Sequence, residues 1–244
     1  MTLSRRLAAE GIGSLLLAAA VVGSGVMAER LAGGNLAIAL LANTAATVAV
    51  LATLIALLAP VSGAHFNPAV SLVLGVRGSL TWGEVSAYAV VQVVGCCLGA
   101  ILAHAMFDLP WLQSSAHVRT GASQWLAEAV ATFGLVLVVL GHQRPQDAAW
   151  MVAAWIGAAY WFTASTSFAN PAITIARSLS DTFSGIRPAD ILGFIVAQVA
   201  GALVAALVAK WLFRIDPVVS TEQTSVDPSA ASPRAVESRA GQSF

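Results

Sequence analysis

Long apolar stretches alternate with short polar connections along most of this chain. A membrane-spanning helix needs about 20 mainly apolar residues, and six stretches come close to that length or exceed it. The fourth and fifth are the shortest. The six stretches cover residues 9–28, 36–59, 85–107, 125–141, 148–164 and 189–213. This pattern predicts an all-α membrane protein with six transmembrane helices.

The first apolar stretch follows a short basic start, MTLSRR. Such a start is also typical of a cleaved signal peptide. Because similar apolar stretches follow throughout the chain, we interpret the first one as a retained transmembrane helix. The signal peptide is the alternative.

Two shorter apolar runs, each of about ten residues, lie between the second and third spans and between the fifth and sixth. Each begins with Asn-Pro-Ala. Asparagine is a favourable N-cap residue, and proline is favoured at the first helical position. Each motif therefore predicts the start of a half-helix that enters the membrane and does not cross it. The motifs are Asn67, Pro68 and Ala69, and Asn170, Pro171 and Ala172.

The two halves of the chain, about 7–107 and 125–213, resemble each other in order and spacing. AEGIGS corresponds to AEAVAT, FNPAV to ANPAI, and QVVG to QVAG, whose glycines Gly95 and Gly201 are predicted helix-crossing points. Each half holds three spans, an odd number, so the second half must enter the membrane from the opposite side. The sequence therefore predicts an inverted 3+3 repeat.

The channel domain is predicted to cover residues 1–213. The remaining segment, 214–244, is rich in serine, proline and charged residues. Such a composition cannot bury enough apolar surface to fold, so we predict a disordered C-terminal tail.

Charged residues make up 10% of the chain and hydrophobic residues 58%, whereas soluble domains carry about 25% charged residues. The formal net charge is zero, which gives no indication of a nucleic-acid partner. The distribution of lysine and arginine predicts cytoplasmic termini in a plasma membrane or cell inner membrane. With that orientation the inner side holds Arg5, Arg6, Arg77, Arg144, Lys210 and Arg214, and the outer side Arg30, Arg119, Arg177 and Arg187.

The sequence gives no sign of a cofactor, metal site or enzyme. The two cysteines, Cys96 and Cys97, are adjacent within an apolar run. Neighbouring side chains on a helix point in different directions, and two thiols without clustered histidines do not form a zinc site. We interpret both as packing residues. No nucleophile–base pair stands out either.

The paired Asn-Pro-Ala motifs also predict chemistry. Irregular backbone in mid-membrane is tolerated where protein or a water-filled cavity satisfies its polar groups. Each asparagine oxygen can cap its half-helix, which leaves the NH₂ donors facing a lumen, and the positive ends of two helix dipoles converge there. A neutral molecule can offer an oxygen to these donors, whereas a cation or a proton relay meets a barrier. Ordinary Asn-Pro turns in loops are the alternative.

The motifs AE-x-x-x-[ST], SGAHFNPAV and ANPA resemble those of the aquaporin and aquaglyceroporin family, the major intrinsic proteins. The resemblance implies six tilted helices with two half-helices, one pore per subunit and a homotetramer. It implies that Glu10 and Glu128 accept hydrogen bonds from the re-entrant loops, and that His65 lines the inner pore. The alternatives are carboxylates near lipid headgroups and a histidine that only packs.

In this family four positions near the outer mouth set the selectivity. Counted without gaps from the two asparagines, they fall on Thr47, Ala158, Ser167 and Ile173. Water-selective members carry an aromatic residue, a histidine and an arginine there, and glycerol facilitators carry the arginine and two aromatic residues. This sequence has none of these side chains at the four positions, which predicts a wider and less polar filter.

Arg177 lies one helical turn beyond Ile173. Two interpretations stay open: a positive charge at the outer vestibule, or an arginine that snorkels to the membrane interface.

An aliphatic residue in place of the filter arginine, followed by TIARS, resembles a bacterial branch linked to arsenic detoxification. We therefore expect a passive channel in the lipid bilayer for water and small neutral solutes, with metalloid hydroxides such as arsenious acid and methylated arsenicals among them. A water or glycerol facilitator is the alternative within the same class. A secondary active transporter is the rival class, because transporters also use inverted repeats and broken helices.

Overall fold

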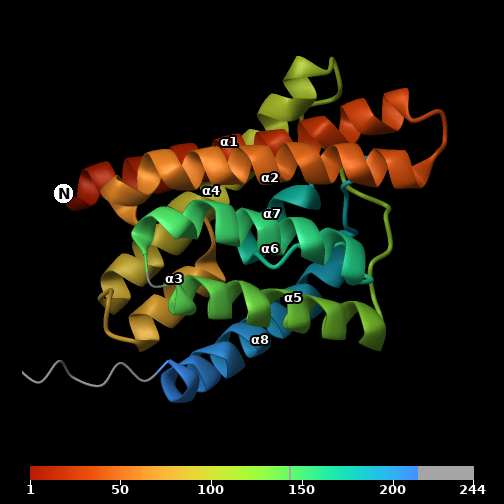
Figure 1. Ribbon diagram of the computed structural model, residues 1–244. Coiled ribbons are helices and arrows are strands. Elements are labelled where there is room, and N and C mark those ends of the chain that lie inside the picture. Colours follow the sequence, from red (N-terminus) through yellow and green to blue (C-terminus); the bar gives the residue numbers. More distant parts are fainter. Residues whose placement is uncertain (143, 214–244) are drawn as a thin grey trace, which may run out of the picture. The chain divides into compact units, whose positions relative to one another are not determined.

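The computed structural model describes residues 1–142 and 144–213. These residues form the predicted all-α architecture (Figure 1), and the predicted tail, 214–244, lies outside them. The helices are α1 (Leu3–Leu31), α2 (Leu36–Ser62), α3 (Pro68–Val76), α4 (Trp82–Met106), α5 (Ala122–Gly141), α6 (Ala148–Phe162), α7 (Pro171–Arg177) and α8 (Ile191–Leu212), with single 3₁₀ turns at Pro145–Asp147 and Pro188–Asp190.

Local sequence signals explain where several helices begin and end. The Asn35 side chain caps α2, and Thr81 and Glu84 form a capping box at the start of α4. Gly63 ends α2 with a left-handed backbone, φ 91°, a conformation that glycine adopts without steric cost. Five of the described helices are long and apolar enough to span a membrane. Helix α6, which belongs to the fifth of the six predicted spans, has 15 residues and is therefore only about 22 Å long.

The two halves of the sequence form equivalent sets of helices. Helix α1 packs against α4 as α5 packs against α8, and the half-helices α3 and α7 contact each other between these pairs. A side chain on Gly95 of α4 would overlap the backbone carbonyl of Gly11 in α1, and one on Gly201 of α8 would overlap that of Ala129 in α5. Equivalent glycines thus allow equivalent close crossings in both halves.

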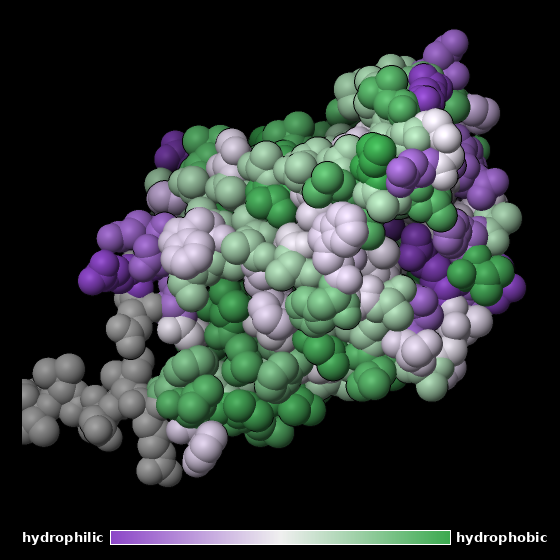
Figure 2. Space-filling model, turned by 45° about the vertical axis from the view of Figure 1, so that its right-hand side comes forward, coloured by the Kyte–Doolittle hydropathy of each residue, from purple (hydrophilic) through white to green (hydrophobic). Residues whose placement is uncertain are grey.

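The outer surface of the helices is apolar. Figure 2 shows hydrophobic side chains across the middle of the visible face and hydrophilic ones gathered towards its two ends. Leu57, Leu126, Leu192 and Leu207 are each about two-thirds exposed. Several charged side chains, by contrast, are buried inside the protein, among them Glu10, Glu128 and Arg177. This inversion is expected for a protein whose solvent is lipid.

Candidate functional site

The half-helices α3 and α7 begin at the two asparagines, as their capping preference predicts. The side-chain oxygen of Asn67 accepts a hydrogen bond from the backbone N–H of Ala69 at 2.9 Å. That of Asn170 accepts one from Ala172, also at 2.9 Å. A proline follows each asparagine at the first helical position, where its missing N–H removes no hydrogen bond.

The same two asparagines tie the half-helices together. The side-chain nitrogen of Asn67 donates to the Ala169 carbonyl at 2.7 Å, and that of Asn170 donates to the Phe66 carbonyl at 2.8 Å. Each amide therefore uses one of its two hydrogens in a bond between the loops. The sequence predicts that both NH₂ hydrogens of each asparagine face a lumen. That prediction is wrong for the hydrogen that bonds to the opposite loop. The other hydrogen is left for the lumen.

The loops before the two half-helices are held in an unusual backbone conformation. Ala64 and Phe66 in the first loop have φ 51° and 47°, and Ser167 and Ala169 at equivalent positions in the second have φ 51° and 48°. Residues other than glycine rarely adopt positive φ, and each instance costs roughly 1–3 kcal/mol. Neighbouring groups must stabilise both loops.

Glu10 supplies that support for the first loop. Its carboxylate accepts hydrogen bonds from the backbone N–H groups of His65 at 3.0 Å and Phe66 at 2.7 Å. It also accepts from the Ser62 hydroxyl at 2.7 Å and the Gln92 amide at 2.8 Å. The side chain is fully buried. The alternative of a carboxylate at the lipid headgroups is therefore wrong, because every contact is with protein.

Glu128 does the same for the second loop. Its carboxylate accepts from the backbone N–H groups of Phe168 and Ala169, both at 2.8 Å, and from the Gln198 amide at 2.6 Å. It too is fully buried. Charge-assisted hydrogen bonds of this kind are about twice as strong as neutral ones, so the two carboxylates offset the strain of the loops.

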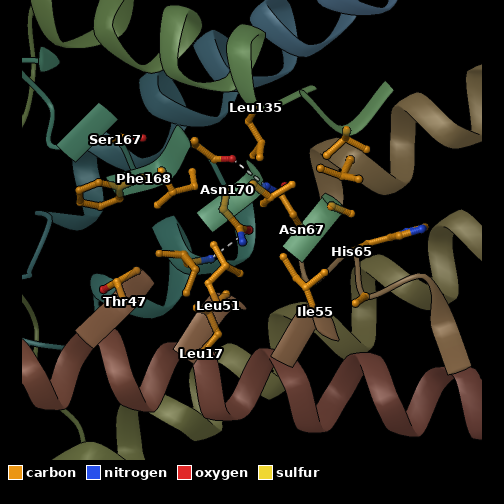
Figure 3. Close-up of a pocket in the computed structure, with 18 of the residues that line it drawn as sticks. Leu17, Thr47, Leu51, Ile55, His65, Asn67, Leu135, Ser167, Phe168 and Asn170 are labelled. Atoms are coloured by element: carbon orange, nitrogen blue, oxygen red, sulfur yellow. Dashed lines mark hydrogen bonds between the residues drawn. The ribbon is translucent and has the colours of Figure 1, made fainter. Parts of the chain in front are cut away.

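A cavity of about 350 Å³ runs past the two asparagines. In Figure 3 Asn67 and Asn170 lie between Thr47 at one end and His65 at the other. Aliphatic side chains also line the cavity, including Leu17, Leu51, Ile55 and Leu135. A lumen with a polar track and an apolar wall suits small molecules that combine hydroxyl groups with an uncharged body.

Three of the four predicted filter residues, Thr47, Ser167 and Ile173, line this cavity. The assignment of the fourth, Ala158, is wrong: its side chain is exposed, and Tyr160 lines the cavity instead. Successive residues of a helix are about 100° apart, so positions 158 and 160 point to nearly opposite sides. Ala158 lies on the outward side of α6, four residues after Ala154 and three before the exposed Trp161.

The aromatic side chains that sequence reasoning missed are Tyr160 and Phe168, which both line the cavity. The expectation that the filter lacks aromatic residues is therefore wrong. Helix α6 is apolar on all sides, so its sequence has no periodicity that distinguishes the two faces. We use "neck" for the part of the cavity lined by Thr47, Tyr160, Ser167, Phe168 and Ile173.

Arg177 does not reach a membrane interface. Its side chain is 2% exposed, and its guanidinium carbon lies 3.4 Å from the centre of the Phe168 ring. Its Nε donates a hydrogen bond to the Ser184 carbonyl. The snorkelling interpretation is therefore wrong, because the charged group is enclosed by protein. The guanidinium does not line the cavity and is separated from it by Phe168.

His65 lines the opposite end of the cavity. Its Nδ1 lies 3.0 Å from the Ser71 hydroxyl, and its ring meets the edge of the Tyr88 ring with the centroids 5.2 Å apart. These contacts fix the imidazole beside the lumen. Packing and pore lining are therefore compatible at this residue.

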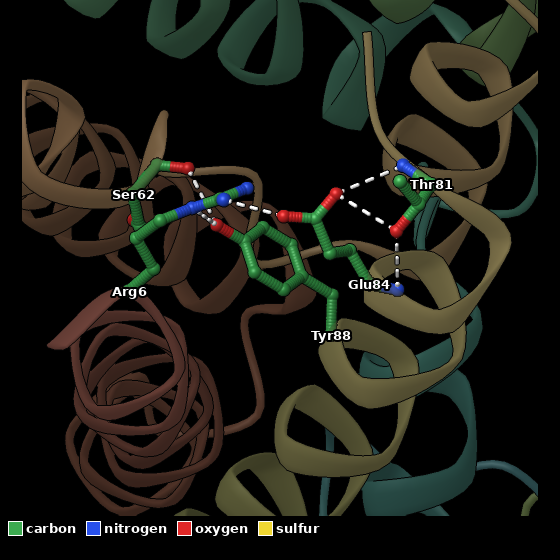
Figure 4. Close-up of polar contacts among 5 residues, drawn as sticks. All are labelled: Arg6, Ser62, Thr81, Glu84 and Tyr88. Atoms are coloured by element: carbon green, nitrogen blue, oxygen red, sulfur yellow. Dashed lines mark hydrogen bonds and ion pairs between the residues drawn. The ribbon is translucent and has the colours of Figure 1, made fainter. Parts of the chain in front are cut away.

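A cluster of polar groups surrounds the Tyr88 hydroxyl (Figure 4). The Tyr88 hydroxyl donates to the Ser62 carbonyl at 3.0 Å and accepts from Arg6 Nε at 2.8 Å. Arg6 also forms an ion pair with Glu84 at 2.6 Å. The cluster joins the start of α1 to the end of α2 and the first turn of α4. It thereby positions the segment that leads into the first loop.

Within the described residues, no group of three histidine, cysteine, aspartate or glutamate side chains is placed to hold a metal ion. Cys96 is buried and Cys97 half-buried, and both are free thiols. The chemistry of the site is therefore that of the hydrogen-bonding groups along the cavity.

The cavity carries a line of polar groups, lies between two facing half-helices and is enclosed by an apolar helical bundle. These features define a membrane channel. Comparison with known proteins identifies the family. The family model described as "Major intrinsic protein" matches residues 1–163 and 143–238. The chain belongs to the major intrinsic protein family, whose members are channels for water, glycerol or other small solutes and not enzymes.

Individual relatives agree with this assignment. The chain is 54% identical over 163 residues to "Aquaglyceroporin AqpS" of Rhizobium meliloti (strain 1021), covering 66% of this chain and 70% of the relative. It is 27% identical over 183 residues to a "Probable glycerol uptake facilitator protein" of Thermotoga maritima, covering 65% and 78%. The aquaglyceroporin structure from Plasmodium falciparum superposes with a TM-score of 0.63 at 21% identity, covering 88% of this chain and 97% of that one. The structural likeness supports the aquaporin fold.

Proposed function

We propose that this channel conducts neutral metalloid hydroxides, such as arsenious acid, and methylated arsenicals, in addition to water. The observation that carries the proposal is Ile173, an aliphatic side chain in the neck directly after Asn170-Pro171-Ala172. Among the described residues that line the cavity there is no arginine or lysine. An isoleucine offers no hydrogen-bond donor and no fixed charge, whereas a guanidinium has five N–H donors. A neck of this kind favours bulkier uncharged solutes.

Arsenious acid suits such a neck because it is a compact neutral triol. Its hydroxyl groups can bond to the free amide hydrogens of Asn67 and Asn170, while its body passes the aliphatic wall. The proposed cargo follows from this match and from the resemblance of the TIARS segment to the arsenic-linked branch.

Glycerol transport is a second candidate, and Tyr160 and Phe168 favour it. Two aromatic residues in the neck offer a flat apolar surface to the carbon backbone of a polyol, while Thr47 and Ser167 offer hydroxyl groups. The two cargoes share their chemistry, since both are small polyhydroxylated neutral molecules. A direct measurement has to separate them.

We also propose passive rather than coupled transport. Coupled transporters place ionisable groups near the midplane, where they bind the driving ion. Here the carboxylates of Glu10 and Glu128 are fully buried, accept hydrogen bonds from the loops and lie outside the cavity lining. Uptake that collapses with a proton or sodium gradient would contradict this proposal.

The proposed setting is a plasma membrane or cell inner membrane, with both termini cytoplasmic and a homotetrameric assembly. The proposed orientation makes the neck the outer end of the pore and His65 its inner end. Residues 1–213 form the proposed channel domain. Native mass spectrometry of the full chain in detergent tests the tetramer, and protease accessibility of tagged termini in intact cells tests the orientation.

The deciding experiment is stopped-flow light scattering on proteoliposomes with water, glycerol and arsenious acid. Permeability to water alone would overturn the metalloid proposal. Ile173→Arg should reduce arsenite flux at least about tenfold, the effect of roughly 1.4 kcal/mol on a barrier, with a smaller effect on water. Ile173→Val is the matched control and should conduct like the original chain. Unchanged arsenite flux in Ile173→Arg would remove Ile173 from the selectivity of the neck.

A further inference from the structure

Phe168 in the neck is the counterpart of His65 at the other end of the pore. Phe168 lies two residues before Asn170, as His65 lies two before Asn67. Each backbone N–H donates to the buried glutamate of its own half. Both rings line the cavity, and both meet the edge of an aromatic ring from the last long helix of their half, with Phe194 5.1 Å from Phe168. Phe168 is therefore fixed as a wall of the neck.

The ring of Phe168 lies against a buried positive charge. The Arg177 guanidinium carbon is 3.4 Å from the ring centre, within the roughly 6 Å range of a cation–π interaction. Within the described residues Arg177 forms no ion pair, and its Nη1 has no hydrogen-bond partner. The Glu128 carboxylate acts on this charge only from beyond ion-pair distance, and surroundings that exclude water screen it weakly.

A second guanidinium lies near the same ring. The Arg119 guanidinium carbon is 5.1 Å from the Phe168 ring centre. Burial lowers the pKa of Arg119 to about 10, so it still carries its charge at neutral pH. Its Nε donates to the Gly185 carbonyl at 2.7 Å, and its other nitrogens reach two further carbonyls. Arg119 thus fastens the loops through several carbonyls, whereas Arg177 is held by the ring and by one hydrogen bond to the Ser184 carbonyl.

We propose that Arg177, stacked on Phe168 and bonded to the Ser184 carbonyl, excludes cations and protons from the neck and so replaces the charge that Ile173 does not provide. The field of the guanidinium charge reaches the lumen across the ring, and the guanidinium itself does not occupy the lumen. Neutral solutes therefore pass an aromatic wall, while a cation meets the field of the buried charge behind it.

The stack also opposes an attraction for cations. An aromatic face attracts cations because of its negative quadrupole. Arg177 lies 3.4 Å behind the ring, so its charge repels a cation that approaches the face of Phe168 turned to the lumen. This proposal depends on the channel function that the family shows and not on metalloid cargo.

The test measures proton flux and glycerol flux in proteoliposomes of the full chain, and compares their ratio. Arg177→Gln removes the charge and retains a side-chain donor, whereas Arg177→Lys retains the charge. Arg30→Gln is the matched control, because Arg30 lies over the Phe107 ring at 5.2 Å in an exposed position outside the cavity lining. In Arg177→Gln we expect the proton-to-glycerol ratio to rise on the order of tenfold, as the loss of one weakly screened charge predicts. The lysine and Arg30 variants should retain the original ratio.

An unchanged ratio in Arg177→Gln would overturn the proposal. So would an equal rise in Arg177→Lys, because the effect would then follow from packing and not from charge. Where Arg177→Gln does not yield folded channels, Phe168→Leu decides. It removes the ring and keeps the charge, because the Arg177 Nε retains its hydrogen bond to the Ser184 carbonyl. The ratio should therefore stay at or below that of the original chain, and a rise would overturn the proposal. Failure to conduct arsenious acid would leave this result unaffected, since only glycerol and protons are measured.

Discussion

The hydroxyl oxygens of Thr47 in α2 and Tyr160 in α6 lie 3.5 Å apart at the neck of the cavity. The two helices come from different halves of the inverted repeat, so the neck is a junction between the halves. Both side chains are almost fully buried, with Tyr160 4% exposed and Thr47 3%. The width of the neck therefore depends on how far the Tyr160 ring extends towards Thr47.

Tyr160→Ala should widen the neck, because it removes the ring that faces Thr47. We expect flux of four-carbon and five-carbon polyols to rise several-fold relative to glycerol, measured by stopped-flow on proteoliposomes. Ala158→Phe is the matched control and should leave the ratio unchanged, because position 158 faces outward. If Ala158→Phe changed the selectivity and Tyr160→Ala did not, Ala158 would be the filter residue, as predicted from the sequence.

Glu128→Gln should destabilise the protein. The carboxylate accepts three N–H donors in a fully buried place, and a glutamine would turn an NH₂ group towards at least one of them. Leaving buried groups of this kind unsatisfied costs about 1–3 kcal/mol, and more for charged partners. The measurement is the midpoint of thermal unfolding in detergent.

Glu84→Gln is the control for that change. Its ion pair with Arg6 is partly exposed, with the two side chains 22% and 23% exposed, and such pairs contribute about 0–1 kcal/mol. If the two variants unfolded at the same temperature, the support of the second loop by Glu128 would be unimportant for stability.

Most of the fold could be predicted from the sequence because its signals are local and occur twice. Spanning helices follow from apolar runs, and the half-helices follow from asparagine and proline at their first positions. The inverted order follows from an odd number of spans in each half. Capping by Asn67 and Asn170 needed no knowledge of the tertiary structure, because the capped N–H groups lie in the next turn.

The bonds between distant segments could not be predicted from the sequence alone. The amide of Asn67 bonds to the carbonyl of Ala169 about a hundred residues away, and no local pattern indicates such a pair. The orientation of α6 was mispredicted because an all-apolar helix has no polar face to indicate direction. Arg177 lies against the ring of Phe168 and is bonded to the Ser184 carbonyl, and only the folded chain brings these groups to its guanidinium.

Gly201→Ala should destabilise the pairing of α5 with α8. A Cβ at this position would overlap the backbone of Ala129, and backbone atoms cannot rotate away as a side chain can. Overpacking of this kind costs roughly 1–3 kcal/mol. Gly83→Ala is the control, since Gly83 lies in the first turn of α4 and no atom of the described residues, apart from its chain neighbours and the nearby backbone of α4, lies within 4 Å of its added methyl group. It should be neutral or stabilise by up to about 1 kcal/mol. Equal unfolding midpoints for the two variants would exclude a close crossing at Gly201.

Asn170→Ala compared with Asn35→Ala should isolate the bond between the two loops. Both asparagines cap a helix, and each side-chain oxygen accepts from two backbone N–H groups. Asn170 alone also donates across the repeat, to the Phe66 carbonyl. Loss of a cap costs about 1 kcal/mol, and we expect that effect from Asn35→Ala.

Asn170→Ala should cost about 1–3 kcal/mol more than Asn35→Ala, because it leaves the Phe66 carbonyl without its partner in a buried place. Denaturant unfolding in detergent measures both changes. The same variant should slow water flux in proteoliposomes, since one free amide hydrogen is lost from mid-pore, while Asn35→Ala should not. If the two variants had equal stability and equal flux, the bond between the loops would contribute nothing measurable. The two asparagines would then act only as separate helix caps.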